Sequence, residues 1–198
     1  MLTKPDPTAV LARMRSAGHT VFESDSVDFN LNLIGIRSRN PQFDRFNDVL
    51  YAMWKFQGVW STYMWPITTL PGKYFMVDRL LNREGCAILA PGQYRGAYAI
   101  GKHRGKYDAL CQRKGAVTVF RDGDRDEEFD LLPSKKRNGW YGINIHRCGA
   151  GGKVPKVGRN SAGCQVFQNS DHFDHFMRLL YKSRDLWGNT FTYTLLQA

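Results

Sequence analysis

The sequence lacks any hydrophobic run long enough to span a membrane or to act as a secretory signal. Pro5, Asp6 and Pro7 interrupt the segment near the start where a signal peptide would lie. Apolar stretches elsewhere are far shorter than a membrane-spanning helix. We therefore expect a protein made in the cytoplasm without a signal peptide and without a membrane span.

Cysteine is also scarce, with four residues in a chain of 198: Cys86, Cys111, Cys148 and Cys164. They are dispersed, and a chain of this length does not need disulfides to fold. No two of them form a CxxC pair, which argues against a zinc ribbon. We expect mostly reduced thiols, no bound metal and no cofactor.

Acidic residues are outnumbered, with 18 Asp and Glu against 28 Lys and Arg, giving a formal charge of +10. This surplus favours a polyanionic partner, either nucleic acid or an anionic bacterial envelope, and charge alone does not choose between them. Hydrophobic residues make up 42% of the chain and aromatic residues 13%. That composition excludes a disordered chain and predicts one folded domain with a core.

The apolar pattern predicts a mainly β (α+β) single domain with a helix near each end. Residues 7–17 and 170–188 show helical periodicity, with candidate caps at Asp6 and Ser170. The second helix is expected to bury Phe173, Phe176, Met177 and Leu180. Strand signals occupy the residues between the helices and those after the second one, including 27–38, 49–60, 73–81, 116–120, 139–147 and 190–196.

One segment is chemically specific: His146, then fourteen residues, then Ser161-Ala162-Gly163-Cys164. A cysteine nucleophile needs a base, free backbone N–H groups for the oxyanion, and room for the carbonyl. His146 is the candidate base, and it is expected to lower the thiol pKa of Cys164. Gly163 lets the chain turn, and its N–H and that of Cys164 are candidate oxyanion donors. Ser161 either bonds the histidine ring or holds the turn.

This arrangement resembles the signature of the L,D-transpeptidase catalytic domain, in which histidine precedes a Ser/Thr-x-Gly-Cys sequence. The segment Thr68–Tyr74 resembles the family's Thr-Pro-x-Gly-x-Phe/Tyr segment, shortened to a Pro-Gly turn. The resemblance spans roughly residues 28 to 196. It implies a β-sandwich-like catalytic domain over 28–198, preceded by an N-terminal helix and lead-in over 1–27.

The chain departs from the family pattern beside the cysteine. Many members have histidine where this chain has Ala162, and Asn or Arg where it has Gln165 and Val166. Those positions help to seat the substrate, so the choice between water and an amine as acceptor stays open.

A basic and aromatic tract over residues 95–114 is the candidate substrate wall. Peptide stems carry carboxylates, which arginine binds well, so we expect substrate contacts from Arg95, His103 and Arg104, with Tyr94 beside them. The same composition also fits a groove for single-stranded nucleic acid.

The resemblance implies a cysteine enzyme that acts on peptidoglycan stem peptides through a thioester on Cys164. Hydrolysis is favoured over cross-linking, as in a phage endolysin or an injected antibacterial effector that reaches the periplasm or cell wall by another route. The alternatives are an L,D-transpeptidase proper, or a non-catalytic phage structural or nucleic-acid-binding module. A zinc site built from His146, Cys148, Cys164 and His172 matches no standard ligand spacing.

Overall fold

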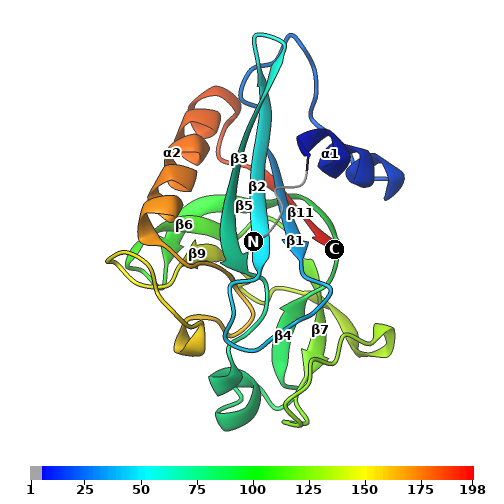
Figure 1. Cartoon of the computed structure of the whole chain (residues 1–198), viewed down its shortest axis with the longest axis vertical. Helices are drawn as coiled ribbons and strands as arrows, with labels where there is room; N and C mark the ends of the chain where they lie inside the picture. Colours follow the sequence, from blue (N-terminus) through cyan, green and yellow to red (C-terminus); the bar gives the residue numbers. More distant parts are fainter. Residues whose placement is uncertain (1–5) are drawn as a thin grey trace.

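A computed structural model describes residues 6–198 and shows one domain built mainly from β-strands. Eight strands close into a barrel in the order β1-β11-β5-β6-β9-β10-β3-β2, and three others form a separate sheet at one end of it (Figure 1). The barrel strands are β1 (Asn32–Arg37), β2 (Asp48–Phe56), β3 (Val59–Thr68), β5 (Gly92–His103), β6 (Tyr107–Gln112), β9 (Ile145–Arg147), β10 (Gln165–Phe167) and β11 (Phe191–Gln197).

The smaller sheet and the helices complete the chain. The sheet contains β4 (Cys86–Leu89), β7 (Val117–Asp122) and β8 (Lys136–Gly139) in that order. The long helices are α1 (Pro7–Ser16) and α2 (Ser170–Trp187), and the short helical turns are η1 (Tyr74–Asp78), η2 (Pro133–Lys135) and η3 (Gly158–Asn160). Residues 1–5 of the expected N-terminal lead-in lie outside the described residues. No helix within 6–198 is both long and apolar enough to cross a membrane.

The mainly β composition and the helix near each end confirm the prediction from sequence. The arrangement differs, because the strands form a closed ring with an added sheet, where two facing sheets were expected. The ring closes because β1 pairs antiparallel with β2 and parallel with β11, which joins the first strand to the last. Closure removes the exposed strand edges that a sandwich would leave.

Each long helix packs as its sequence predicts, with one change in capping. The Asp6 carboxylate accepts a hydrogen bond from Thr8 N at 3.1 Å, which caps α1. The cap of α2 is Asn169, whose side chain accepts from Asp171 N at 2.8 Å. Ser170, the expected cap, is instead the first helical residue, and its hydroxyl accepts from the backbone N–H of a loop glycine.

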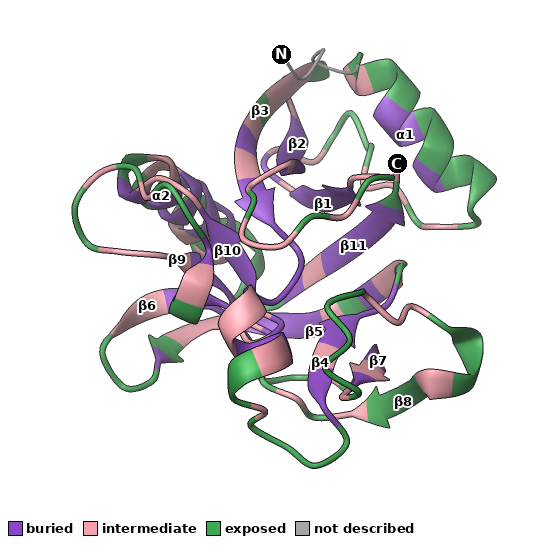
Figure 2. Cartoon of the chain, turned by 60° about the horizontal axis from the view of Figure 1, so that its bottom comes forward, coloured by how far each residue is buried: buried purple, intermediate pink, exposed green. Residues whose placement is uncertain are grey.

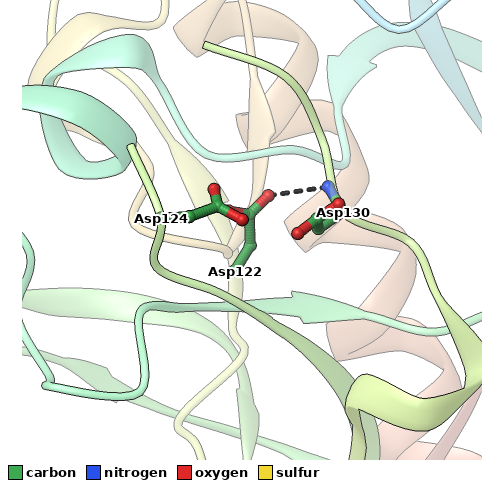
Figure 3. Close-up of side chains that lie close together, drawn as sticks. All are labelled: Asp122, Asp124 and Asp130. Atoms are coloured by element: carbon green, nitrogen blue, oxygen red, sulfur yellow. Dashed lines mark hydrogen bonds between the residues drawn. The ribbon is translucent and has the colours of Figure 1, made fainter. Parts of the chain in front are cut away.

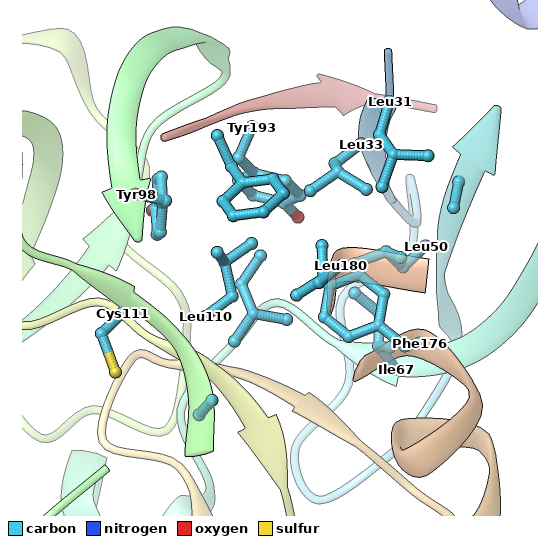
Figure 4. Close-up of a cluster of buried hydrophobic side chains, with 14 of the residues drawn as sticks. Leu31, Leu33, Leu50, Ile67, Tyr98, Leu110, Cys111, Phe176, Leu180 and Tyr193 are labelled. Carbon is cyan, nitrogen blue, oxygen red and sulfur yellow. The ribbon is translucent and has the colours of Figure 1, made fainter. Parts of the chain in front are cut away.

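The main core fills the barrel and continues into α2. Leu33, Leu50 and Ile67 from the barrel converge with Phe176 and Leu180 from the helix (Figure 4). Burial follows the same pattern, with β1, β10 and β11 mostly buried and β8 mostly exposed (Figure 2). The predicted apolar stripe of α2 is therefore confirmed as the face that covers the barrel. The apolar side of α1, which carries Val10, Leu11 and Met14, packs with residues of β1 and β2 in a second cluster.

Two segments predicted as strands are irregular. Residues 73–81 were expected to be extended, but the N–H groups of Phe75 and Met76 both bond to Gly72 O, so the chain winds into η1 after the Pro-Gly turn. Residues 139–147 were expected to form one strand, but only the last three of them form β9. Both irregular segments lie beside the cavity described next.

Candidate active site

The predicted base lies on β9, and the predicted nucleophile lies just before the neighbouring barrel strand β10. Strands β9 and β10 run parallel, with Gln165 opposite Ile145 and Val166 opposite His146. Cys164 immediately precedes β10. Because side chains alternate along a strand, Cys164 and His146 belong to the same face of this strand pair.

Cys164 opens onto a cavity of about 440 Å³. The cavity lies between the barrel and the small sheet, because its walls come from β4, from the turn after β5 and from the irregular segment before β9. No acidic residue of the described chain lines it, whereas two arginines do. Its polar and aromatic lining includes Cys164, His103, Arg104, Arg121, Trp140 and Asn144.

The turn that presents Cys164 is held by Ser161. The Ser161 hydroxyl donates to Cys164 O at 2.8 Å and accepts from Gly163 N at 3.2 Å. Of the two roles considered for Ser161, the structure therefore gives it the turn. The N–H of Gly163, predicted to bind an oxyanion, is already used in this bond. The N–H of Cys164 has no acceptor among residues 6–198 and stays available.

Gly163 is required at this turn for two reasons. Its φ is +127°, a backbone region that side-chain-bearing residues rarely adopt. A Cβ at this position would also lie 2.0 Å from the carbonyl oxygen of Ala87 on β4. The small sheet thus fixes the cysteine turn by direct backbone contact.

The Pro-Gly segment supports the same turn from the other side. Gly72 N donates to Ser161 O at 2.9 Å. Just before it, the fully buried Arg37 donates to Thr69 Oγ1 at 2.8 Å, and the buried Asp48 carboxylate accepts from Thr69 N at 2.7 Å. The segment Thr68–Tyr74 therefore supports the cysteine turn through the bond from Gly72 to Ser161, and none of its residues lines the cavity.

The His146 ring is oriented by the next peptide carbonyl. His146 Nδ1 lies 2.8 Å from Arg147 O, and Tyr107 lies nearby, with its hydroxyl donating to the same carbonyl at 3.3 Å. A carbonyl only accepts, so Nδ1 carries the ring proton and Nε2 keeps its lone pair. Nε2 has no partner among residues 6–198 and is not sealed from solvent. The ring is therefore in the tautomer that a general base requires.

A second histidine accompanies the first. His103, at the end of β5, stacks on His146 with ring centroids 4.1 Å apart and planes 21° apart. The sequence placed His103 in the substrate wall, and the structure lines the cavity with it, whereas His146, on which it stacks, is not among the lining residues.

The other three residues expected to contact substrate do not lie together. Arg104 lines the cavity from the turn between β5 and β6. Arg95 is exposed on β5 and is not part of the cavity. Tyr94 is buried, and its hydroxyl bonds to the carbonyls of Ala90 and Thr118, so it is a structural residue and does not face the cavity.

Sequence reasoning overlooked Asn144, Arg121 and Trp140 in the cavity wall. A signal existed for Asn144, since it lies two residues before His146 and alternation places both on one face. None existed for Arg121 and Trp140, because they come from β7 and from the segment after β8, which only the tertiary fold brings near Cys164.

Burial sets the protonation of the pair. It raises the pKa of Cys164 to about 11, although the backbone N–H of Asn144 and the charge of Arg104 favour the thiolate. It also lowers the pKa of His146 to about 3, and the adjacent His103 adds to that effect. At neutral pH the resting pair is therefore a neutral thiol and a neutral imidazole. The expected low thiol pKa was wrong, because the site withdraws both charges from water.

This assignment predicts the alkylation profile of Cys164. Labelling by iodoacetamide should keep rising from about pH 6 to about pH 10, because the thiolate fraction grows towards a high pKa. The rate is read by peptide mass spectrometry, with Cys164→Ser as the blank. A plateau already reached near neutral pH would contradict the neutral pair and indicate a resting thiolate–imidazolium pair.

The remaining thiols and the acidic cluster are less suited to chemistry at this site. All four cysteines are free. Cys86 also lines the cavity, but its thiol donates to Phe75 O at 3.2 Å, and burial raises the pKa of Cys86 and that of Cys148 to about 12. Asp122, Asp124 and Asp130 gather outside the cavity (Figure 3). The ammonium group of Lys135 contacts Asp124 at 3.3 Å and also Asp130, and so already supplies a positive charge to them.

Comparison of the chain with protein-family models, curated proteins and solved structures found no match.

Proposed function

We propose that this protein is a cysteine enzyme that acts on peptidoglycan stem peptides through a thioester on Cys164, with hydrolysis as the favoured outcome. One observation carries the proposal. A histidine in the base tautomer and a cysteine on a rigid turn share one face of adjacent strands, and the cysteine opens onto a cavity.

The proposal implies a simple sequence of steps. As the Cys164 sulfur attacks the scissile carbonyl, its proton passes to His146 Nε2, and the Cys164 N–H donates to the developing oxyanion. The C–N bond then breaks, and the amine leaves with the proton from His146. Water next attacks the thioester and gives its proton to His146, the C–S bond breaks, and the sulfur recovers the proton. An amine in place of water would give a cross-link.

The substrate class rests on two features. The spacing from His146 to Cys164 resembles the L,D-transpeptidase signature, and membership in that family is part of the proposal. The cavity also presents Arg104, for which the structure gives no acidic partner within 6–198 and which suits the carboxylates of stem peptides, whereas Arg121 already pairs with Glu84 at 3.5 Å and donates to Gly85 O at 2.8 Å. Such an enzyme would meet its substrate in the periplasm or cell wall, and the net charge of +10 favours an anionic envelope.

The nucleic-acid alternative has weaker support from the basic tract. A single-strand groove needs aromatic rings on which bases stack. Tyr94 and Tyr98 are buried, and the guanidinium of Arg147 lies 4.7 Å from the centre of the Tyr107 ring. The aromatic residues of the tract therefore serve the fold and leave few free faces for bases.

Purified sacculi test the proposal. The native protein should change the muropeptides detected by mass spectrometry, giving shortened stems on hydrolysis or new cross-links on exchange. Replacing the base, as His146→Gln, should slow the reaction about a hundredfold or more, which is the usual contribution of a positioned base. Unchanged muropeptides with native protein, in sacculi that a muramidase still solubilises, would reject the proposal.

A further inference from the structure

A chain of hydrogen bonds fixes the proton on His103. Gln112 N donates to Asn144 Oδ1 at 3.0 Å, and Asn144 Nδ2 lies 3.1 Å from His103 Nδ1. A backbone N–H only donates, so the amide oxygen must face Gln112 and the amide nitrogen must face the ring. His103 Nδ1 is therefore an acceptor, and the neutral ring carries its hydrogen on Nε2.

The two stacked histidines consequently hold opposite tautomers. His146 is protonated on Nδ1 and presents a lone pair at Nε2, whereas His103 is protonated on Nε2 and presents a donor. His103 Nε2 has no partner among residues 6–198 and is not sealed from solvent, and the residue lines the cavity of Cys164. The free N–H of His103 is thus available to a ligand in that cavity.

The groups around His103 keep its ring neutral. Arg104 follows it in the turn, Tyr107 on β6 lies 5.7 Å from it between ring centres, and His146 on β9 covers its face. A second proton on Nδ1 would point at the Asn144 amide hydrogens and would approach two other basic groups. Burial first, and then the charge of Arg104, lower the pKa of His103 in agreement with this arrangement.

Arg104 occupies a costly backbone position beside this donor. Its φ is +50°, and Gly105 follows at φ +72°, so the turn needs two left-handed residues. Asparagine or glycine suits such a turn better than arginine. The strained arginine lines the cavity, which indicates that its side chain is used there.

We propose that the Gln112–Asn144–His103 hydrogen bonds hold His103 as a neutral Nε2–H donor, which binds a substrate carboxylate beside Cys164 together with Arg104, and does not act as a second base. The inference rests on the proposed function in taking Cys164 as the reacting atom. Its tests do not use peptidoglycan, so the two ideas can fail separately.

Nitrogen-15 NMR of the histidine rings reads the tautomers directly. In native protein near neutral pH, His103 should appear as Nε2–H and His146 as Nδ1–H. Replacing the amide by a carboxylate, as Asn144→Asp, should move the His103 proton to Nδ1 or give a cation, because a carboxylate only accepts. A native His103 protonated on Nδ1 would overturn the assignment.

Paired alkylating reagents test the carboxylate site. Both reagents react with the thiolate of Cys164, but only iodoacetate carries a carboxylate. The ratio of the iodoacetate rate to the iodoacetamide rate is therefore independent of the thiolate fraction and measures how strongly the site attracts a carboxylate. His103→Ala and Arg104→Asn should each lower this ratio about tenfold, the value of a hydrogen bond to a charged group. His103→Gln, which keeps an N–H donor, should retain most of it. The control is Lys106→Ala, an equal loss of charge in the same turn but outside the cavity.

Each outcome decides the matter. A ratio that falls with His103→Ala but survives His103→Gln supports the donor role. A ratio unaffected by His103→Ala, or lowered equally by Lys106→Ala, shows that only general positive charge attracts the reagent and overturns the proposal. If sacculi stay unchanged while the ratio behaves as expected, the carboxylate site stands and the substrate class is wrong.

Discussion

Cys164→Ser should abolish turnover of peptidoglycan fragments, with a loss of about a thousandfold or more, and leave the fold intact. A hydroxyl is far less acidic than a thiol, and a buried neutral imidazole is too weak a base to activate it. The change is nearly isosteric, and the serine hydroxyl can donate to Gly142 O as the thiol does at 3.5 Å. Product release by mass spectrometry and thermal melting together give the measurement.

Cys148→Ser is the matched control, since Cys148 is also half-buried but does not line the cavity. It should retain full activity. Turnover that persists in Cys164→Ser, with the melting temperature unchanged, would show that another group is the nucleophile.

Gly163→Ala should remove most of the activity and also destabilise the protein. The added Cβ would lie 2.0 Å from Ala87 O at a φ of +127°, so the cysteine turn or β4 must shift. Displacing a reactive group by about 1 Å costs roughly a hundredfold in rate. Backbone strain of this kind costs about 1–3 kcal/mol of stability. Chemical denaturation and the rate on muropeptides would measure both effects.

Gly151→Ala provides the comparison within the same loop, because a Cβ there meets nothing within 4 Å and the φ is not left-handed. It should be close to neutral for both activity and stability. A Gly163→Ala protein with native activity would mean that the geometry of the turn does not govern the reaction.

Local patterns predicted the elements of this fold better than their assembly. The apolar stripes of the two long helices and the Asp6 cap are local signals, and they predicted both helices, although the cap of α2 is Asn169 and not Ser170. Barrel closure depends on pairing β1 with β11, whose residues Leu33 and Tyr193 lie far apart in sequence. No periodicity reports such a contact, and the two facing sheets were expected from the family resemblance.

The site shows the same division between local and distant information. Motif spacing predicted Cys164 and His146 as the catalytic pair, which stays a prediction, and alternation could have added Asn144 to the cavity wall. The stacking of His103 on His146 follows from the order β5-β6-β9 in the barrel, which the sequence does not reveal. The raised thiol pKa was missed because burial is a tertiary property, and the groups that favour the thiolate are the Asn144 N–H and Arg104, whereas the expectation relied on His146.

Trapping the acyl-enzyme tests the central claim most directly. Native protein is mixed with purified muropeptides, quenched in acid after short times, and analysed by intact-protein and peptide mass spectrometry. We predict an added mass equal to a stem-peptide acyl group, located on the peptide that contains Cys164, released by hydroxylamine and absent from Cys164→Ser. Product formation without any such adduct at Cys164, or an adduct on another residue, would contradict the account.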